Sequence, residues 1–269
     1  MEFEEYLTKA GVLNAQVQFL DVATFMTGAG ATPDAAIAVP PNEVHSAISS
    51  KALAEAISSP LSQQGIEALY SYRTPKLGPN GTCSISKDLE EKPFDLGNEV
   101  LGVSWQDASV AAASPHTLRL RRLKALMDGL AHICKVDWIG VYRTIRPADG
   151  SAPFLVKEAY NGAPSRAKFP LTEEFATLSN NSWVGMNGKA KFVQNTDTYE
   201  GPYYICDARV KSELCAPIFS SDGSRVLGII DAESFQDRWF DQPERVLLIL
   251  HTCFQLGSEF ELLAATDKK

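Results

Sequence analysis

Positive charge is in deficit in this sequence, which has 25 Lys plus Arg residues against 33 Asp plus Glu and a formal net charge of -8 at pH 7. A surplus of acids repels the phosphate backbone, so nucleic acid is excluded as the expected partner. Long apolar runs are also lacking: no stretch approaches the roughly 20 apolar residues that cross a bilayer, and the opening MEFEEYLTK is acidic where a secretory signal begins with positive charge. These absences predict a cytoplasmic protein that does not contact a membrane.

Cysteine is scarce and irregularly spaced. The five cysteines contain no C-x-x-C pair, and their odd number does not fit a disulfide framework. The four histidines lie at no metal-ligand spacing, so no metal site is predicted. What the chain does have is size and apolar content, because 269 residues that are 45% hydrophobic are enough to bury a full core. A globular fold without a metal site is expected.

The composition changes partway along the chain. Residues 1–115 are rich in Ala, Ser, Pro and Gly and contain only short helical patterns, at 2–10, at 17–25 and, most clearly, at 42–58. Residues 59–114 have no long periodic run. The segment 1–115 carries no chemical motif, and we interpret it as an N-terminal extension or small helical subdomain that packs on the rest of the chain.

Residues 116–269 have the regular patterns of a folded domain. Apolar residues at three- and four-residue spacings predict helices, and alternating β-branched and aromatic residues predict strands. The predicted elements are a helix at 116–134, strands at 136–145 and 154–160, a hairpin of strands at 213–219 and 226–234, and a helix at 241–265. This order predicts an α/β domain of the α+β type, in which an antiparallel sheet carries helices on one face.

One cysteine lies in surroundings that favour chemistry. Cys206 is in a polar stretch and is followed by Arg209 and Lys211. Nearby cations favour the reactive thiolate over the thiol. The alternative is an unreactive cysteine that is half-buried or on the surface.

Two sets of side chains share faces of the predicted strands. Asp231 and Glu233 are two residues apart, so both point to one face, and Glu213 lies on the neighbouring strand of the hairpin. If the three converge, they form an acidic pocket for an ammonium group, and their repulsion raises at least one pKa. The alternative is a solvated face of the sheet. Trp138 and Tyr142 are four apart on another strand, where they belong either to the core or to the apolar wall of a ligand pocket.

Four blocks of sequence, in this order and spacing, resemble one family. They are Asp137-Trp138-Ile139-Gly140-Val141-Tyr142; Asn161-Gly162 with Lys168-Phe169-Pro170; Cys206-Asp207-Ala208 with Ser212-Glu213; and Gly228-Ile229-Ile230-Asp231-Ala232-Glu233-Ser234 with Arg238-Trp239-Phe240-Asp241. Across about residues 116–265 the chain is similar to the single-domain GAF proteins that reduce free methionine-R-sulfoxide. The resemblance implies a GAF fold over 116–269, with an antiparallel sheet between N- and C-terminal helices and one deep pocket.

The resemblance also implies roles for individual residues. Cys206 matches the nucleophile that attacks the sulfoxide sulfur, and Trp138 and Tyr142 match the aromatic wall around the substrate methyl group. The carboxylates that bind the substrate's amino group and help to protonate the sulfoxide oxygen are matched by Glu213, Asp231 and Glu233. The implied function is that of a free methionine-(R)-sulfoxide reductase. Such an enzyme needs no bound cofactor, is recycled by an external thiol from the thioredoxin or glutathione system, and forms a homodimer.

The chain departs from this family in its cysteines. The family's two further cysteines precede the nucleophile, at positions held here by Arg166 or its neighbours and by the region of Asn180, and no cysteine lies between Cys134 and Cys206. Glu233 also stands where the family tends to have Asp. The alternative function is a noncatalytic GAF module that binds a small ligand or senses redox state through Cys206.

Cys215 is a candidate for the missing resolving thiol. It lies two residues after Glu213 and therefore on the same face of the predicted strand. The alternatives are that Cys215 is buried in the core, or that an external thiol resolves Cys206 directly.

Overall fold

The computed structural model describes residues 1–12, 46, 50, 51, 54, 60–78, 88–201, 203 and 207–266. The helix predicted at 17–25 lies outside the described residues, and so does most of the helix predicted at 42–58. Cys83 and Cys206 lie outside them as well. The helix predicted at 2–10 is confirmed as α1 (Phe3–Lys9).

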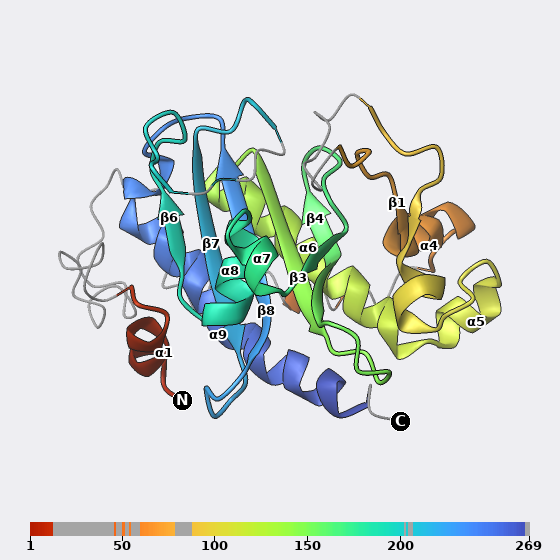
Figure 1. The fold of residues 1–269 in the computed structure, drawn as a ribbon. Coiled ribbons are helices and arrows are strands. Elements are labelled where there is room, and N and C mark those ends of the chain that lie inside the picture. Colours follow the sequence, from red (N-terminus) through yellow and green to blue (C-terminus); the bar gives the residue numbers. More distant parts are fainter. Residues whose placement is uncertain are drawn as a thin grey trace.

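A six-stranded antiparallel sheet forms the centre of the molecule, with its strands in the order β5-β4-β3-β8-β7-β6 (Figure 1). The strands are β3 Trp138–Ile145, β4 Phe154–Asn161, β5 Lys168–Pro170, β6 Lys191–Val193, β7 Ser212–Phe219 and β8 Val226–Ser234. The four longer strands confirm the predicted strands and the predicted hairpin. The sequence pattern does not predict β5 and β6, because three residues are too few to show an alternation.

Two long helices cover one face of the sheet. α6 (Pro115–Cys134) lies against β3 and β4, and α9 (Pro243–Thr266) lies against β7 and β8 (Figure 1). Both confirm predicted helices, although α9 begins two residues after Asp241 because Trp239–Asp241 form a separate 3-10 turn. Within the described ranges, no helix is both long and apolar enough to cross a membrane.

The main hydrophobic core lies between these two helices and the sheet. Residues three and four apart on each helix meet every second residue of the strands, and the buried set includes Leu123, Met127, Leu130, Ile139, Val141, Ile230, Leu247 and Leu250. α1 packs against α9 and joins this core, and the Tyr6 hydroxyl donates a hydrogen bond to Pro217 O at 2.8 Å. The start of the chain is therefore packed together with the sheet.

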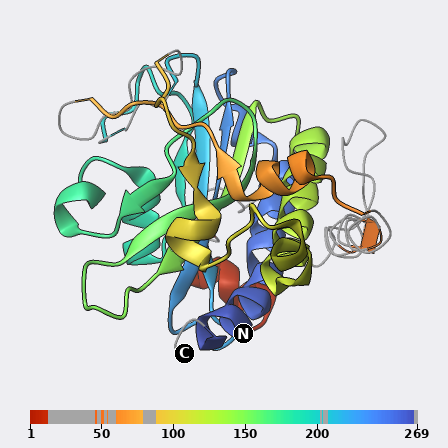
Figure 2. The same ribbon diagram turned by 90° about the vertical axis from the view of Figure 1, so that its right-hand side faces the viewer.

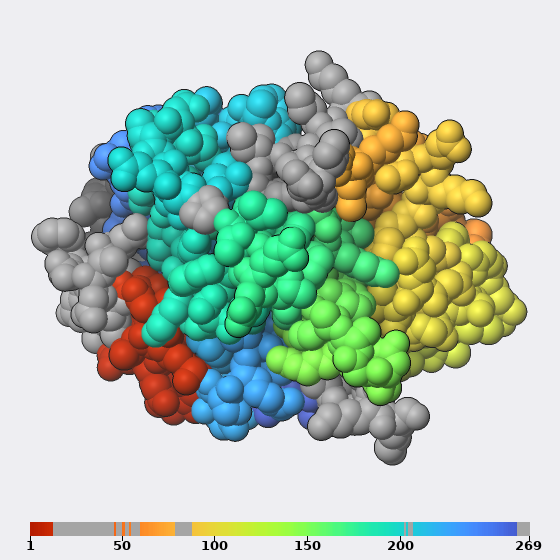
Figure 3. Space-filling view, viewed as in Figure 1, coloured from red at the N-terminus to blue at the C-terminus, as the bar shows by residue number. Residues whose placement is uncertain are grey.

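The opposite face of the sheet carries two short helices, α7 (Glu173–Ala176) and α8 (Asn180–Asn187), which cover it at the centre of Figure 3. α8 contacts β4, β5, β7 and β8. The prediction that helices lie on one face only is therefore wrong, whereas a sheet between helices, as the resemblance implied, is confirmed. Apolar periodicity fails here because α8 directs polar side chains, those of Asn180 and Asn181, toward the sheet.

Residues that precede α6 form a further layer beside β4 (Figure 2). Its elements are α4 Gln63–Tyr70, β1 Ser71–Tyr72, β2 Phe94–Asp95, a π-helical turn Gly97–Leu101 and α5 Ala108–Ala113. Tyr70 and Trp105 of this layer share a hydrophobic cluster with Leu120 of α6 and Val156 of β4. The segment packs on the sheet domain, and the division of the chain at residue 115 stays a prediction.

A β-bulge in β4 determines which of its side chains reach each face. Tyr142 of β3 pairs with Lys157, whereas Gly140 pairs with Tyr160, so Glu158 is an extra residue in the ladder. Residues 140 and 142 share a face, and Lys157 and Tyr160 therefore share it too although they are three apart. Both lie on the face that carries α8, while Glu158 points toward α6.

Glu158 is the centre of a buried ion cluster between the sheet and α6. Its carboxylate pairs with Arg119 of α6 and accepts a hydrogen bond from Arg143 Nε at 2.7 Å. Burial raises the pKa of Glu158, but the two guanidiniums outweigh burial and hold the pKa below its ordinary value. The cluster joins α6 to β3 and β4 through charges that water does not reach.

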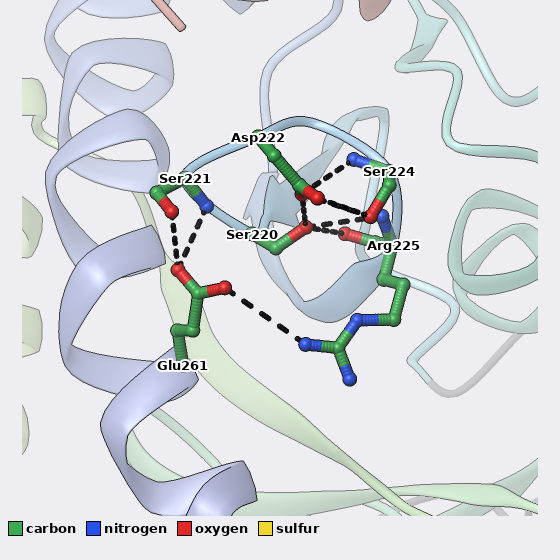
Figure 4. Close-up of polar contacts among 6 residues, drawn as sticks. All are labelled: Ser220, Ser221, Asp222, Ser224, Arg225 and Glu261. Atoms are coloured by element: carbon green, nitrogen blue, oxygen red, sulfur yellow. Dashed lines mark hydrogen bonds and ion pairs between the residues drawn. The ribbon is translucent and has the colours of Figure 1, made fainter.

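The turn between β7 and β8 is fixed by hydrogen bonds at its tip (Figure 4). Asp222 accepts from the hydroxyls of Ser220 and Ser224, at 2.6 and 2.8 Å. Glu261 of α9 accepts from Ser221 N at 3.1 Å. The two strands that carry the predicted carboxylates are therefore tied to each other and to α9 at this end.

Candidate functional site

One cavity lies between the sheet and α8, on the face that the predicted site residues share. Its volume is about 20 Å³, which is room for one ordered water, so a ligand as large as an amino acid has to widen it. The lining residues are Trp138, Tyr142, Ser165, Phe169, Ser179, Asn180, Asn181, Glu213, Asp231 and Glu233. The structure thus brings together the two predicted aromatic residues and the three predicted carboxylates.

The register of the strands explains why the carboxylates meet. Glu233 of β8 lies opposite both Trp138 of β3 and Glu213 of β7, and Asp231 lies two residues away on the same face. One oxygen of each carboxylate lies within 4.8 Å of the others. Glu213 is only 5% exposed and Asp231 only 4%, while Glu233 is half-buried. The alternative of a solvated sheet face is therefore wrong.

Burial dominates the acid–base behaviour of this group. It raises the pKa of Glu213, and it raises the pKa of Asp231 well above its ordinary value, to which the charge of Glu213 adds. A cation that enters the cavity stabilises the ionised form of these buried carboxylates. Among the described residues these three carboxylates are close enough to hold a metal ion, and oxygen ligands suit hard cations such as Ca²⁺. The same arrangement suits an ammonium group.

Two asparagines that the sequence does not predict as site residues hold the buried carboxylates. They are the first residues of α8, which Ser179 caps. Asn180 Nδ2 donates to Glu213 Oε1 at 3.1 Å, and Asn181 Nδ2 donates to Asp231 Oδ2 at 2.9 Å. Asn180 Oδ1 and Asp231 Oδ1 are buried with no hydrogen-bond partner among the described residues. The cavity therefore has two oxygen acceptors available to a ligand that donates hydrogen bonds.

Tyr203 adds a hydroxyl to the same group. It hydrogen-bonds Glu213, and its pKa is raised by burial and by the negative charges of Glu213, Glu233 and Asp231. The hydroxyl therefore stays protonated and donates to the carboxylate. The sequence gives no signal that Tyr203, which lies three residues before Cys206, contacts Glu213.

Trp138 and Tyr142 form the aromatic side of the cavity. Their ring centroids are 6.4 Å apart, and the Trp138 Nε1 donates to Ala163 O at 3.0 Å, which fixes the plane of the indole. Gly140 between them is needed for space, because a Cβ there would lie 2.4 Å from the Trp138 ring. Both aromatic side chains are also part of a buried cluster with Leu155. Trp138 and Tyr142 therefore belong both to the hydrophobic core and to the wall of the cavity.

The two positions where the resembled family has further cysteines carry side chains with other contacts. Asn180 binds Glu213, as described above. The guanidinium of Arg166 lies over the rings of Phe169 and Phe175, with 5.4 and 4.6 Å to the centroids. Asn180 thus makes a hydrogen bond, and Arg166 makes cation–π contacts, that a cysteine at either position would not make.

The predicted nucleophile, Cys206, lies outside the described residues, but the cations that follow it are placed. Arg209 Nη2 contacts Asp207 Oδ2 at 2.6 Å, and Lys211 Nζ contacts Asp197 Oδ2 at 2.9 Å. Each cation is thus matched by an aspartate. The electropositive environment of Cys206 itself stays a prediction, because Cys206 lies outside the described residues.

Cys215 lies on the cavity side of β7, directly opposite Asp231 of β8. It is fully buried and belongs to the cluster of Trp138 and Tyr142. Burial raises its pKa well above the ordinary value, and the charges of Asp231 and Glu213 raise it further. A thiol that resists ionisation is a poor nucleophile, so these surroundings favour the core alternative for Cys215 over a resolving role.

Comparison with known proteins places the fold. Residues 119–260 match the GAF domain family, and no curated protein sequence matches the chain. The chain is similar to the solved type II free methionine-R-sulfoxide reductase from Thermoplasma acidophilum, at 17% identity and a TM-score of 0.45 over 54% of this chain and 94% of that one. It is also similar to the free methionine-R-sulfoxide reductase from Neisseria meningitidis, at 23% identity and a TM-score of 0.44 over 62% and 89% of the two chains.

A third similar structure is the GAF domain of the Acinetobacter phosphoenolpyruvate-protein phosphotransferase, at 16% identity and a TM-score of 0.41 over 56% of this chain and 86% of that one. Because the family match spans more than half of its residues, the chain belongs to the GAF domain family.

Proposed function

We propose that the protein reduces free methionine-R-sulfoxide to methionine, with Cys206 as the attacking thiol. The observation that carries the proposal is the meeting of three carboxylates and two aromatic rings around one buried cavity. The carboxylates suit the ammonium group of a free amino acid, and the rings suit its apolar methyl end. The sequence blocks that resemble the reductases contain these five residues and Cys206.

In the proposed reaction the Cys206 thiolate attacks the sulfoxide sulfur. The S–O bond of the substrate breaks, an S–O bond forms at the cysteine, and one proton completes the hydroxyl of a sulfenic acid. Two electrons pass from the cysteine sulfur to the methionine sulfur. An external thiol, from thioredoxin or glutathione, then displaces water to form a mixed disulfide, and a second thiol releases Cys206 and leaves as the disulfide.

Asp231 and Glu233 are proposed to divide the acid–base work with Glu213. An acid whose pKa is raised by burial keeps its proton nearer to neutral pH and is suited to protonate the departing oxygen, as Asp231 is. Glu213 and Glu233 hold the ammonium group of the substrate, and Asp231 joins them once it has given up its proton, as in the complex with methionine. Tyr203 and the two asparagines keep the group in place through hydrogen bonds.

The first prediction concerns turnover with a small thiol. Purified protein is expected to consume the R epimer of free methionine sulfoxide in the presence of dithiothreitol, and Cys206→Ser is expected to abolish the activity because no thiolate remains. Methionine formation is measured by chromatography. Cys83→Ser is the matched control and should retain full activity. Folded wild-type protein with no turnover above the enzyme-free rate would overturn the proposal.

A noncatalytic GAF module that binds a small ligand or senses redox state through Cys206 is the second candidate. The balanced charges at Arg209 and Lys211 and the lack of the family's further cysteines favour it. A module of this kind would bind an amino acid in the cavity without converting it. The dithiothreitol assay separates the two candidates.

The second prediction concerns Cys215. Because its thiol is buried and resists ionisation, Cys215→Ser is expected to leave thioredoxin-supported turnover within about twofold of wild type, and that turnover should be slower than turnover with dithiothreitol. Both rates are measured under identical substrate concentrations. A tenfold loss that is specific to thioredoxin would assign Cys215 a resolving role instead.

A further inference from the structure

A buried lysine lies behind the wall of the cavity, in a place where the sequence pattern gives no reason to expect one. Lys157 of β4 is 0% exposed and pairs with Tyr142 across the ladder. Burying an ammonium group is costly unless its hydrogens find acceptors. The Nζ atom of Lys157 donates to Ser165 O at 2.8 Å and to Ser165 Oγ at 2.6 Å.

Ser165 connects this ammonium group to the cavity. It is itself a lining residue of the cavity, together with Trp138 and Asp231. Because its Oγ accepts a hydrogen bond from Lys157, its own hydrogen points elsewhere, and no acceptor for that hydrogen is found in the part of the chain that the structure describes. Ser165 is therefore placed to donate a hydrogen bond into the cavity, with a positive charge directly behind its oxygen.

Aromatic rings enclose the lysine on the other sides. Its Nζ lies 4.1 Å from the ring centroid of Tyr160, 4.9 Å from that of Tyr72 and 5.9 Å from that of Trp138. Tyr72 comes from the layer before α6, and its hydroxyl donates to Lys157 O at 2.6 Å. This layer thus helps to keep water away from the ammonium group, so the charge is weakly screened toward the cavity.

The cavity therefore has two ends of opposite charge. Glu213, Asp231 and Glu233 form the acidic end on β7 and β8, and Lys157 with Ser165 forms the positive end beyond β3, on the side of β4. Lys157 is near enough to favour ionised Asp231, because its charge acts to lower the pKa of that carboxyl. A free α-amino acid carries an ammonium and a carboxylate on one carbon, and so matches both ends at once.

We propose that Ser165 Oγ, backed by Lys157 Nζ, binds the α-carboxylate of a zwitterionic amino acid whose ammonium group lies against the three carboxylates. The inference rests on the proposed function in that it uses the same cavity. It adds the residues that restrict the ligand to a free amino acid and reject its amide or a residue within a peptide. Lys157 acts through Ser165 and is a positioning residue.

The test compares binding of L-methionine and L-methioninamide by calorimetry at about pH 6.5, where both amines are mostly protonated. Wild-type protein is expected to bind L-methionine at least tenfold more tightly than the amide. Ser165→Ala and Lys157→Met are expected to reduce that ratio to about twofold or less, with affinity for the amide unchanged, because the amide has no carboxylate to lose. Ser220→Ala is the matched control in the β7–β8 turn and should keep the wild-type ratio.

A tenfold preference that persists in folded Ser165→Ala, or wild-type protein that does not distinguish the two ligands, would overturn the subsite. Melting temperatures show whether each variant is folded, and Ser165→Ala carries the test if Lys157→Met does not fold. The ratio separates a binding role from a merely structural one. Turnover is measured independently: discrimination without turnover removes only the reductase proposal, and turnover without discrimination removes only the subsite.

Discussion

Asp231→Asn is expected to weaken binding of L-methionine about 100-fold while making the ligand-free protein more stable at neutral pH. The loss of affinity follows because the substitution removes a buried charge that pairs with the ammonium group. The gain in stability follows because burial and the charge of Glu213 raise the pKa of Asp231, so its ionised form is unfavourable in the empty cavity. An asparagine still offers an oxygen to Asn181 Nδ2, which donates to Asp231 at 2.9 Å.

The pH dependence has a definite sign. A carboxyl whose pKa is higher in the folded than in the unfolded state contributes stability fully below the unfolded pKa, and that contribution is lost as the pH rises through the folded pKa. Wild-type stability should therefore fall between about pH 5 and about pH 8 more steeply than that of Asp231→Asn. Urea unfolding at the two pH values measures this, and calorimetry measures the affinity.

Asp222→Asn is the matched control. Hydrogen bonds from Ser220 and Ser224 lower the pKa of Asp222 in the β7–β8 turn, so its contribution is present above the unfolded pKa and is lost as the pH falls through the folded one. Asp222→Asn should therefore lower stability at neutral pH, where Asp231→Asn raises it, and should leave L-methionine binding unchanged. An Asp231→Asn protein that binds L-methionine as wild type does would contradict the assigned ammonium site.

Glu158→Ala is expected to lower the free energy of unfolding by about 3–5 kcal/mol, a large share of the stability of an ordinary domain. The substitution leaves the guanidiniums of Arg119 and Arg143 buried without the carboxylate that they share. Urea unfolding measures the loss. Because the pKa of Glu158 is held below its ordinary value, the contribution is present above the unfolded pKa and is lost as the pH falls through the folded one.

An exposed ion pair supplies the control for Glu158→Ala. Glu99 Oε2 contacts Lys168 Nζ at 3.1 Å, with side chains 47% and 37% exposed. Glu99→Ala is expected to cost about 1 kcal/mol or less, because solvent screens such pairs. Equal losses for the two variants would show that the cluster at Glu158 is not buried from water as described.

The sequence predicts the long elements of the fold because each is long enough to show a recognisable pattern of apolar residues facing the core. β7 and β8 are mainly buried runs of eight and nine residues joined by a turn of small polar residues, and α6 and α9 repeat an apolar stripe over 20 and 24. β5, β6 and α8 are short, and α8 faces the sheet with amides. Those elements therefore lie below what apolar periodicity can detect.

Site residues on the long strands are predictable from the sequence, and those elsewhere are not. Side chains an even number of residues apart on a strand point to the same face. Asp231 and Glu233 therefore share a face, as do Trp138 and Tyr142, and the structure brings both pairs to one cavity. The sequence does not predict Lys157 as a residue near the site, because the bulge at Glu158 interrupts this alternation in β4. Ser165 and the asparagines of α8 reach the cavity from outside the long strands, where spacing carries no information about direction.

The most direct test of the proposed chemistry is a single turnover without reductant. Protein with fully reduced thiols is mixed with excess free methionine-R-sulfoxide, and methionine is quantified against protein while the sulfenic acid is trapped with dimedone and located by mass spectrometry. We predict about one methionine per chain, with dimedone attached to Cys206, and no methionine from Cys206→Ser. A folded wild-type protein that binds L-methionine in the cavity and yet releases no methionine would contradict it.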